Sequence, residues 1–136
     1  MYRKIMIPLD LVHHAAQGKA IATAVELARI WKAQLVFVGV TANTPGALAH
    51  SPEEYSEKLT EFAANYGKDI ATSAHAVVSH DPAVDLDSTL LKAVQETAAD
   101  LVVMQTHHHR VTDWIWPSNG GTLATHADCS VMLVRD

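Results

Sequence analysis

The sequence predicts an α/β fold, a single doubly wound domain with a five-stranded parallel sheet and helices on both faces. Short, wholly apolar runs alternate along the chain with segments in which apolar residues recur at helical spacing. The length of 136 residues suits one domain, residues 1–136, and no repeat or linker divides it. Because crossovers between parallel strands are right-handed, a reversal after the second strand predicts the strand order 3-2-1-4-5.

The first half of the chain contains two predicted strands and two predicted helices. Residues 5–10 form an apolar run that ends in a proline and an acid, typical of a buried strand at its carboxyl end. Helical spacing follows over residues 15–33, and a β-branched and aromatic run over residues 35–40 favours a second strand. Ser51 then caps a helix, with proline next and an acid three residues later, and Gly67 is a candidate terminator.

The second half continues the alternation. Either Asp87 or Ser88 is expected to cap a third helix, and Ser118 a short last one. Three further apolar runs are predicted strands: residues 74–78, 101–104 and 130–134.

Composition excludes several classes of function. The net charge of -5 argues against nucleic acid as a partner, because binding phosphates needs a basic face. No apolar run reaches the roughly 18–20 residues of a membrane span. Residues 1–4 lead straight into a strand without a cleavage site, so no signal peptide is expected. With Cys129 the only cysteine, no intramolecular disulfide can form, and a cytoplasmic location is expected.

Three segments resemble the universal stress protein family. The run Met1–Asp10 is similar to that family's opening, in which the first strand ends in Pro-x-Asp. Ala99–Met104 and His126–Arg135 are similar to its fourth and last strands, in the same order and spacing. The resemblance implies a cytoplasmic homodimer assembled through the last strand, Ser130 to Val134. It favours a stress-response or signalling module without enzymatic activity.

The loop after the fourth strand departs from the family's ATP motif. Many family members bind ATP through Gly-x2-Gly-x9-Gly-Ser/Thr, whose glycines let phosphates approach the backbone. Here Gln105 and His108 stand at the first two glycines, Pro117 stands at the third in a loop one residue shorter, and Ser118 keeps the hydroxyl. The side chains of Gln105 and His108 would then occupy the space that the phosphate groups use. Pro117 has no backbone N–H to donate to a phosphate. We expect no ATP in the usual pose; the alternative is ATP binding through a rearranged loop, residues 105–118.

The resemblance also indicates which residues would face a nucleotide. Asp10 has a second interpretation, since a carboxylate at a strand end can cap the first turn of the helix that follows. Val40 and Thr41 would border an adenine pocket through backbone atoms. The full set of nucleotide-binding candidates is Pro8, Asp10, Val40, Thr41, Gln105, His108, Ser118 and Asn119.

Histidines follow the two strands expected to be neighbours, so they should meet in the crevice between the loops after strands 1 and 4. Neutral imidazoles bind zinc, nickel or copper, and protonated ones attract an anion. A solvated loop is the third interpretation, and all three stay open. The candidates are His13, His14, His107, His108 and His109.

No catalytic group is predicted. The Gly-x-Ser-x-Gly motif of serine hydrolases is missing. The loop after the fourth strand has no Lys or Arg besides Arg110, and no pair of acids is suited to hold a metal for ATP hydrolysis. The sequence therefore predicts a protein that is not an enzyme.

Overall fold

The computed structural model describes residues 1–82, 84–106 and 119–135. These residues form a five-stranded sheet in the order β3-β2-β1-β4-β5, with every pair of neighbouring strands parallel. The predicted fold class and strand order are confirmed. The elements are β1 (Lys4–Pro8), the 3-10 helix η1 (His14–Gln17), α1 (Gly18–Trp31), β2 (Gln34–Ala42), α2 (Pro52–Ala64), β3 (Thr72–Ser79), α3 (Leu86–Thr97), β4 (Leu101–Thr106), α4 (Asn119–His126) and β5 (Ser130–Arg135).

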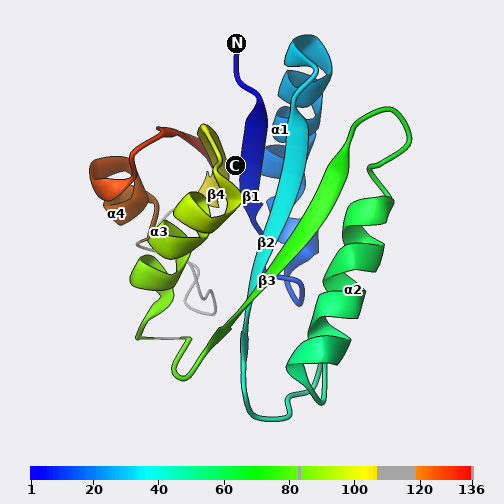
Figure 1. The fold of residues 1–136 in the computed structure, drawn as a ribbon, viewed down its shortest axis with the longest axis vertical. Coiled ribbons are helices and arrows are strands. Elements are labelled where there is room, and N and C mark those ends of the chain that lie inside the picture. The colour runs from blue at the N-terminus through cyan, green and yellow to red at the C-terminus, as the bar shows by residue number, and fades with distance from the viewer. Residues whose placement is uncertain (83, 107–118, 136) are drawn as a thin grey trace.

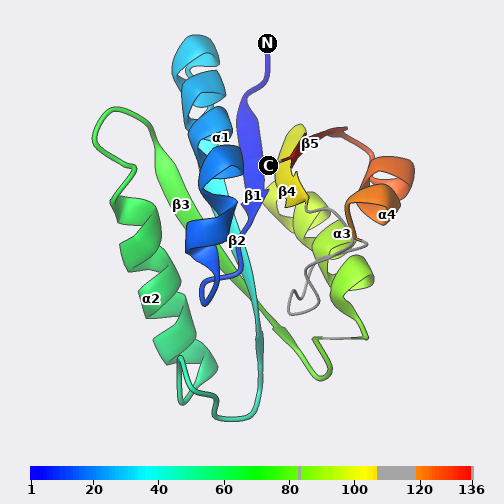
Figure 2. The same cartoon turned by 180° about the vertical axis from the view of Figure 1, so that it is seen from behind.

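Helices cover both faces of the sheet, with α1 and α2 on one side and α3 and α4 on the other (Figures 1 and 2). Two hydrophobic cores result. Ile5 and Ile7 of β1 belong to the core under α1 and α2, whereas Met6 between them belongs to the core under α3 and α4. Successive side chains of a strand point to opposite faces, so a strand buried on both faces must be apolar throughout. This is why the short apolar runs identified the strands.

The start of α2 follows the sequence prediction, but its end does not. The Ser51 hydroxyl oxygen accepts a hydrogen bond from the Glu54 backbone N–H at 3.1 Å, with proline at the first helical position. The helix ends at Ala64, so the prediction that Gly67 terminates it was wrong. The capping residue Asn65 keeps a right-handed conformation, and no glycine of the described residues has a positive φ. The chain therefore leaves α2 without needing a left-handed glycine.

Neither residue predicted to cap α3 does so. The helix begins at Leu86 with Asp85 at the capping position, and no side chain accepts from its first turn there. The Ser88 hydroxyl instead donates to the Asp85 backbone carbonyl at 2.9 Å. Asp87 lies inside the first turn, where a negative charge is favoured by the helix dipole.

Gly120 in α4 permits close packing of helix on sheet. A Cβ at this position would lie 2.8 Å from Leu133 of β5 and 3.2 Å from the Thr106 methyl group of β4. This close packing accounts for the glycine at position 120. In the part of the chain that the structure describes, no helix is both long and apolar enough to cross a membrane.

Candidate functional site

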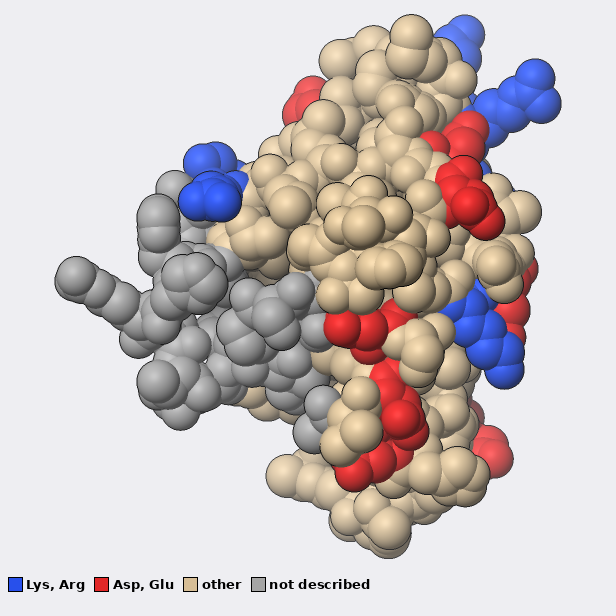
Figure 3. Space-filling view, turned by 90° about the vertical axis from the view of Figure 1, so that its left-hand side faces the viewer, with Lys and Arg blue, Asp and Glu red and all other residues tan. Residues whose placement is uncertain are grey.

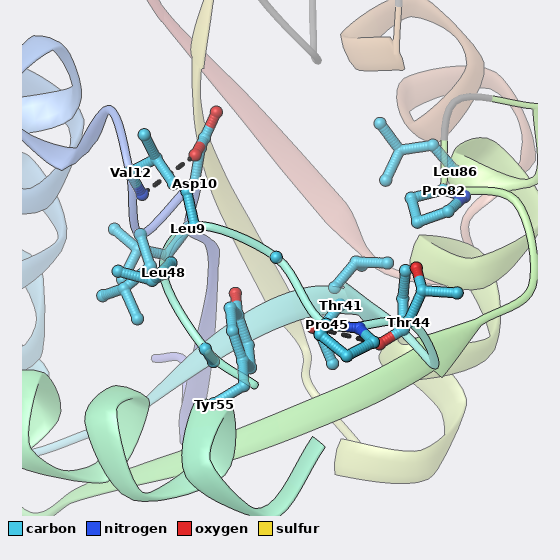
Figure 4. Close-up of a pocket in the computed structure, with 16 residues that line it drawn as sticks. Leu9, Asp10, Val12, Thr41, Thr44, Pro45, Leu48, Tyr55, Pro82 and Leu86 are labelled. Carbon is cyan, nitrogen blue, oxygen red and sulfur yellow. Dashed lines mark hydrogen bonds between the residues drawn. The ribbon is translucent and has the colours of Figure 1, made fainter. Parts of the chain in front are cut away.

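A cavity of about 310 Å³ lies at the carboxyl ends of β1 and β2 (Figure 4). The loop after β1, the end of β2, the segment 44–49, α2 and the turn before α3 all contribute to its wall. Most of the lining is apolar, including Leu9, Val40, Leu48, Pro82 and Leu86. In an open parallel sheet, ligands bind outside the carboxyl ends of the strands, and pockets of this size and lining are typical of small-molecule sites.

Asp10 closes the turn after β1 and does not cap α1. Its side chain is 5% exposed, and Oδ1 accepts from the backbone N–H groups of Val12 and His13 at 3.1 and 3.3 Å. Oδ2 lies 2.8 Å from His13 Nδ1. The Gln17 side chain accepts from the Asp10 N–H at 2.7 Å and donates to the Pro8 carbonyl at 3.0 Å. This network holds a buried carboxylate in a fixed position at one end of the cavity.

Gln105 connects the end of β4 to the start of α1. Its side chain is 3% exposed, and Oε1 accepts from the Ala20 backbone N–H at 2.9 Å. The first N–H groups of a helix have no partner within the helix, so Gln105 satisfies one of them. The side chain that stands at the first glycine of the family motif therefore links β4 to α1 through this hydrogen bond.

The two histidines after β1 diverge. The His13 ring bonds to Asp10, whereas the His14 ring packs against Phe62 of α2 with ring centroids 5.0 Å apart. Among the described residues no group of three or more His, Cys, Asp or Glu side chains could hold a metal ion. The other predicted ligands lie outside the described residues: His107, His108 and His109.

The structure brings only some of the nucleotide-binding candidates together. Asp10, Val40 and Thr41 line the cavity, whereas Pro8 is buried in β1 and does not. The described cavity thus lies beside β1 and β2, whereas the loop after β4 that would form the predicted crevice lies outside the described residues. Of the loop candidates, His108 and Ser118 lie outside the described residues, and Asn119 opens α4 with its side chain not described.

Tyr55 is a cavity residue that is not among the site residues predicted from the sequence. Its side chain is 6% exposed and lines the cavity from α2. Burial raises the pKa of the Tyr55 phenol, and the nearby charge of Asp10 raises it further, so the phenol stays protonated at neutral pH. The sequence signal for this packing is Gly39, a glycine within a strand whose other residues are mostly large and apolar. A glycine in such a strand indicates that a side chain or backbone from elsewhere approaches closely.

The segment 44–49 forms the outer wall of the cavity and is attached to α2. The Leu48 carbonyl accepts a hydrogen bond from the Lys58 ammonium group, which also pairs with Glu54 at 3.3 Å. The Gly46 N–H donates to the Ala49 carbonyl at 2.9 Å. The Lys58 bond holds the segment against the helix that carries Tyr55, and the Gly46 bond closes a turn within the segment.

Acidic side chains gather below the centre of the face on the α3 side of the molecule (Figure 3). Asp81 and Asp85, both exposed, and the partly exposed Asp87 come from the turn before α3 and from its first turn. The same turn supplies Pro82 and Leu86 to the cavity wall. This side of the cavity is therefore unfavourable for a phosphate group.

The sequence matches a known protein family, and the structure is similar to solved structures of that family. The sequence model of the universal stress protein family matches residues 1–135. A protein of that family from Burkholderia pseudomallei has 27% sequence identity and a TM-score of 0.69, covering 98% of this chain and 96% of its own. A universal stress protein from Archaeoglobus fulgidus has 19% identity and a TM-score of 0.69, covering 98% of both chains.

Several similar structures hold an adenine nucleotide. A universal stress protein from Archaeoglobus fulgidus in complex with dAMP has 20% identity and a TM-score of 0.63, covering 97% of both chains. A family protein from Arabidopsis thaliana with AMP bound has 16% identity and a TM-score of 0.60, covering 98% of this chain and 91% of its own. A universal stress protein in complex with cAMP is also similar, at 17% identity and a TM-score of 0.65, covering 98% of this chain and 97% of its own.

Proposed function

Since the chain belongs to the universal stress protein family, we propose that it is a cytoplasmic, non-enzymatic stress-response module that binds an adenine nucleotide without holding ATP in the usual pose. The cavity beside β1 and β2 is the proposed site for the base. Its apolar lining and its volume of about 310 Å³ suit the faces of a flat aromatic ring system. The nucleotides named for the related structures, AMP, dAMP and cAMP, support this ligand class.

The observation that carries the argument against ATP in its usual pose is the buried Gln105 side chain. It occupies the space between β4 and α1 that a glycine would leave open, and it is hydrogen-bonded there. Among the described residues that line the cavity, none is Lys or Arg, and Asp10 is buried at one end. A triphosphate lacks a compensating charge in this part of the site, so a smaller nucleotide is favoured.

A thermal-shift measurement tests the proposal. A ligand that binds only the folded state stabilises it by about 2.7 kcal/mol at roughly one hundred times its Kd. We expect AMP to raise the Tm by several degrees and ATP with magnesium to raise it much less. Adenine absorbance released from denatured protein should report a bound monophosphate if any nucleotide is retained. An ATP-magnesium shift equal to that of AMP would contradict the proposal.

We also propose that two copies associate through β5, residues Ser130 to Val134. This strand is one edge of the sheet, and Met132 and Leu133 on it are 37% and 38% exposed. An edge strand with exposed apolar side chains is a template for pairing with another chain. A second copy of the same strand would cover both the open backbone groups and these side chains.

Met132→Glu is expected to convert a dimer into a monomer, because it places a charge on the proposed shared edge. Light scattering coupled to size exclusion measures the mass directly. Val78→Glu is the matched control, since Val78 is 44% exposed on β3, the opposite edge of the sheet. A monomeric wild type would contradict the proposed dimer, and a dimer lost only in the Val78 variant would place the contact at β3.

A further inference from the structure

The Tyr55 side chain brings a hydroxyl group to the cavity wall. Its side chain is more than nine-tenths buried, and no hydrogen bond joins it to another described residue. Figure 4 shows the ring rising from α2, with the hydroxyl directed toward the Leu9–Asp10 end of the cavity. A buried phenol hydroxyl usually finds a hydrogen-bond partner, so this group is available for a ligand.

The ring is held in place by its neighbours. A Cβ at Gly39 would lie 2.9 Å from Tyr55 Cε1 and Cζ, so the ring lies directly against the β2 backbone. The first turn of α2, from which Tyr55 projects, is capped by Ser51. The Leu48 side chain lines the same cavity (Figure 4). A side chain fixed in this way loses little conformational entropy when a ligand binds.

Charge at this end of the cavity favours a hydrogen-bond donor on the ligand. The buried Asp10 carboxylate lines the same cavity as Tyr55, and its charge adds to the effect of burial in raising the pKa of the phenol. The neutral hydroxyl can therefore accept from an amino group, while the carboxylate attracts that group's partial positive charge. A carbonyl oxygen in the same position would face a negative charge.

We infer that Tyr55 determines specificity for the base: its hydroxyl accepts a hydrogen bond from the exocyclic amino group of a 6-aminopurine, while the Asp10 charge disfavours the carbonyl group of a 6-oxopurine. This inference rests on the proposed function, because it concerns the base in the same cavity. A site that hydrogen-bonds a polar group discriminates strongly against an analogue that lacks it. One such interaction corresponds to roughly a tenfold difference in Kd.

The test compares AMP, IMP and purine riboside monophosphate, which has no substituent at carbon 6, by isothermal titration. We expect the wild type to bind AMP at least about tenfold more tightly than either analogue. In Tyr55→Phe, AMP binding should weaken about tenfold and the preference over IMP should shrink to about twofold. Tyr66→Phe is the matched control, because Tyr66 packs in the aromatic cluster with Phe37 and Phe62 and does not line the cavity.

The possible outcomes separate the inference from the function beneath it. If the wild type binds AMP and the Tyr55→Phe variant keeps the full preference over IMP, the role of Tyr55 is overturned and the nucleotide site stands. Equal wild-type affinity for the three ligands also overturns it, without any variant. If no wild-type binding occurs at all, the proposed function fails together with the inference.

Discussion

Gly39→Ala is expected to lower the free energy of unfolding by about 1–3 kcal/mol and to abolish AMP binding. The added methyl group would lie 2.9 Å from two ring carbons of Tyr55 and would overlap its hydroxyl oxygen. The ring must then leave the β2 backbone, and the space it can move into is the cavity. Urea unfolding measures the stability change, and titration with AMP measures the binding.

A double mutant identifies the cause of the Gly39 effect. In a Tyr55→Leu background the overlapping atoms are gone, so Gly39→Ala should be neutral or stabilising by up to about 1 kcal/mol, since alanine costs less backbone entropy than glycine. Gly121→Ala serves as the control, because nothing lies within 4 Å of a Cβ built at that position. The close approach of ring and strand would be disproved by an equal loss in both backgrounds.

Gln105→Ala should cost about 1–3 kcal/mol of stability, because it leaves a buried helix N–H without its side-chain acceptor. The bond in question joins the Ala20 N–H to Gln105 Oε1 at 2.9 Å. Hydrogen exchange at the Ala20 amide should accelerate in the variant. Gln95→Ala provides the comparison, since Gln95 is exposed on α3, and it should change stability by less than about 0.5 kcal/mol.

A loss below about 0.5 kcal/mol in Gln105→Ala would show that the bond across β4 and α1 contributes little. It would also weaken the case against ATP in its usual pose, because a loosely held side chain could move aside for phosphates. The stability measurement and the thermal shift with ATP should therefore be made on the same preparations.

Strand positions and sheet order could be predicted because they depend on patterns that are local or nearly universal. Strands buried on both faces must be continuously apolar, and the handedness of crossovers leaves few arrangements of five such strands. The Ser51 cap was predictable for the same reason, since its partner is three residues away. By contrast, both capping candidates for α3 were wrong, because side chains of the same type can bond to several nearby backbone groups.

The contents of the site depended on contacts between distant parts of the chain. Tyr55 follows the helical apolar pattern of α2, and nothing local distinguishes it from a core residue. Its role emerges only where α2 packs on Gly39 of β2, 16 positions earlier in the sequence. Asp10 could be singled out from its place at a strand end, but not its bonds to the turn that follows.

The sequence by itself determined the fold and the family resemblance, and it predicted a functional region at the carboxyl ends of the strands. The spacing of apolar residues and the polar residues at strand ends are local sequence patterns, so both can be recognised without coordinates. Only the tertiary structure decided that the cavity lies beside β1 and β2, that Gln105 bonds to α1, and that Tyr55 lines the cavity. Those features arise from packing between elements far apart in sequence, and a local pattern carries no information about which side chains will meet.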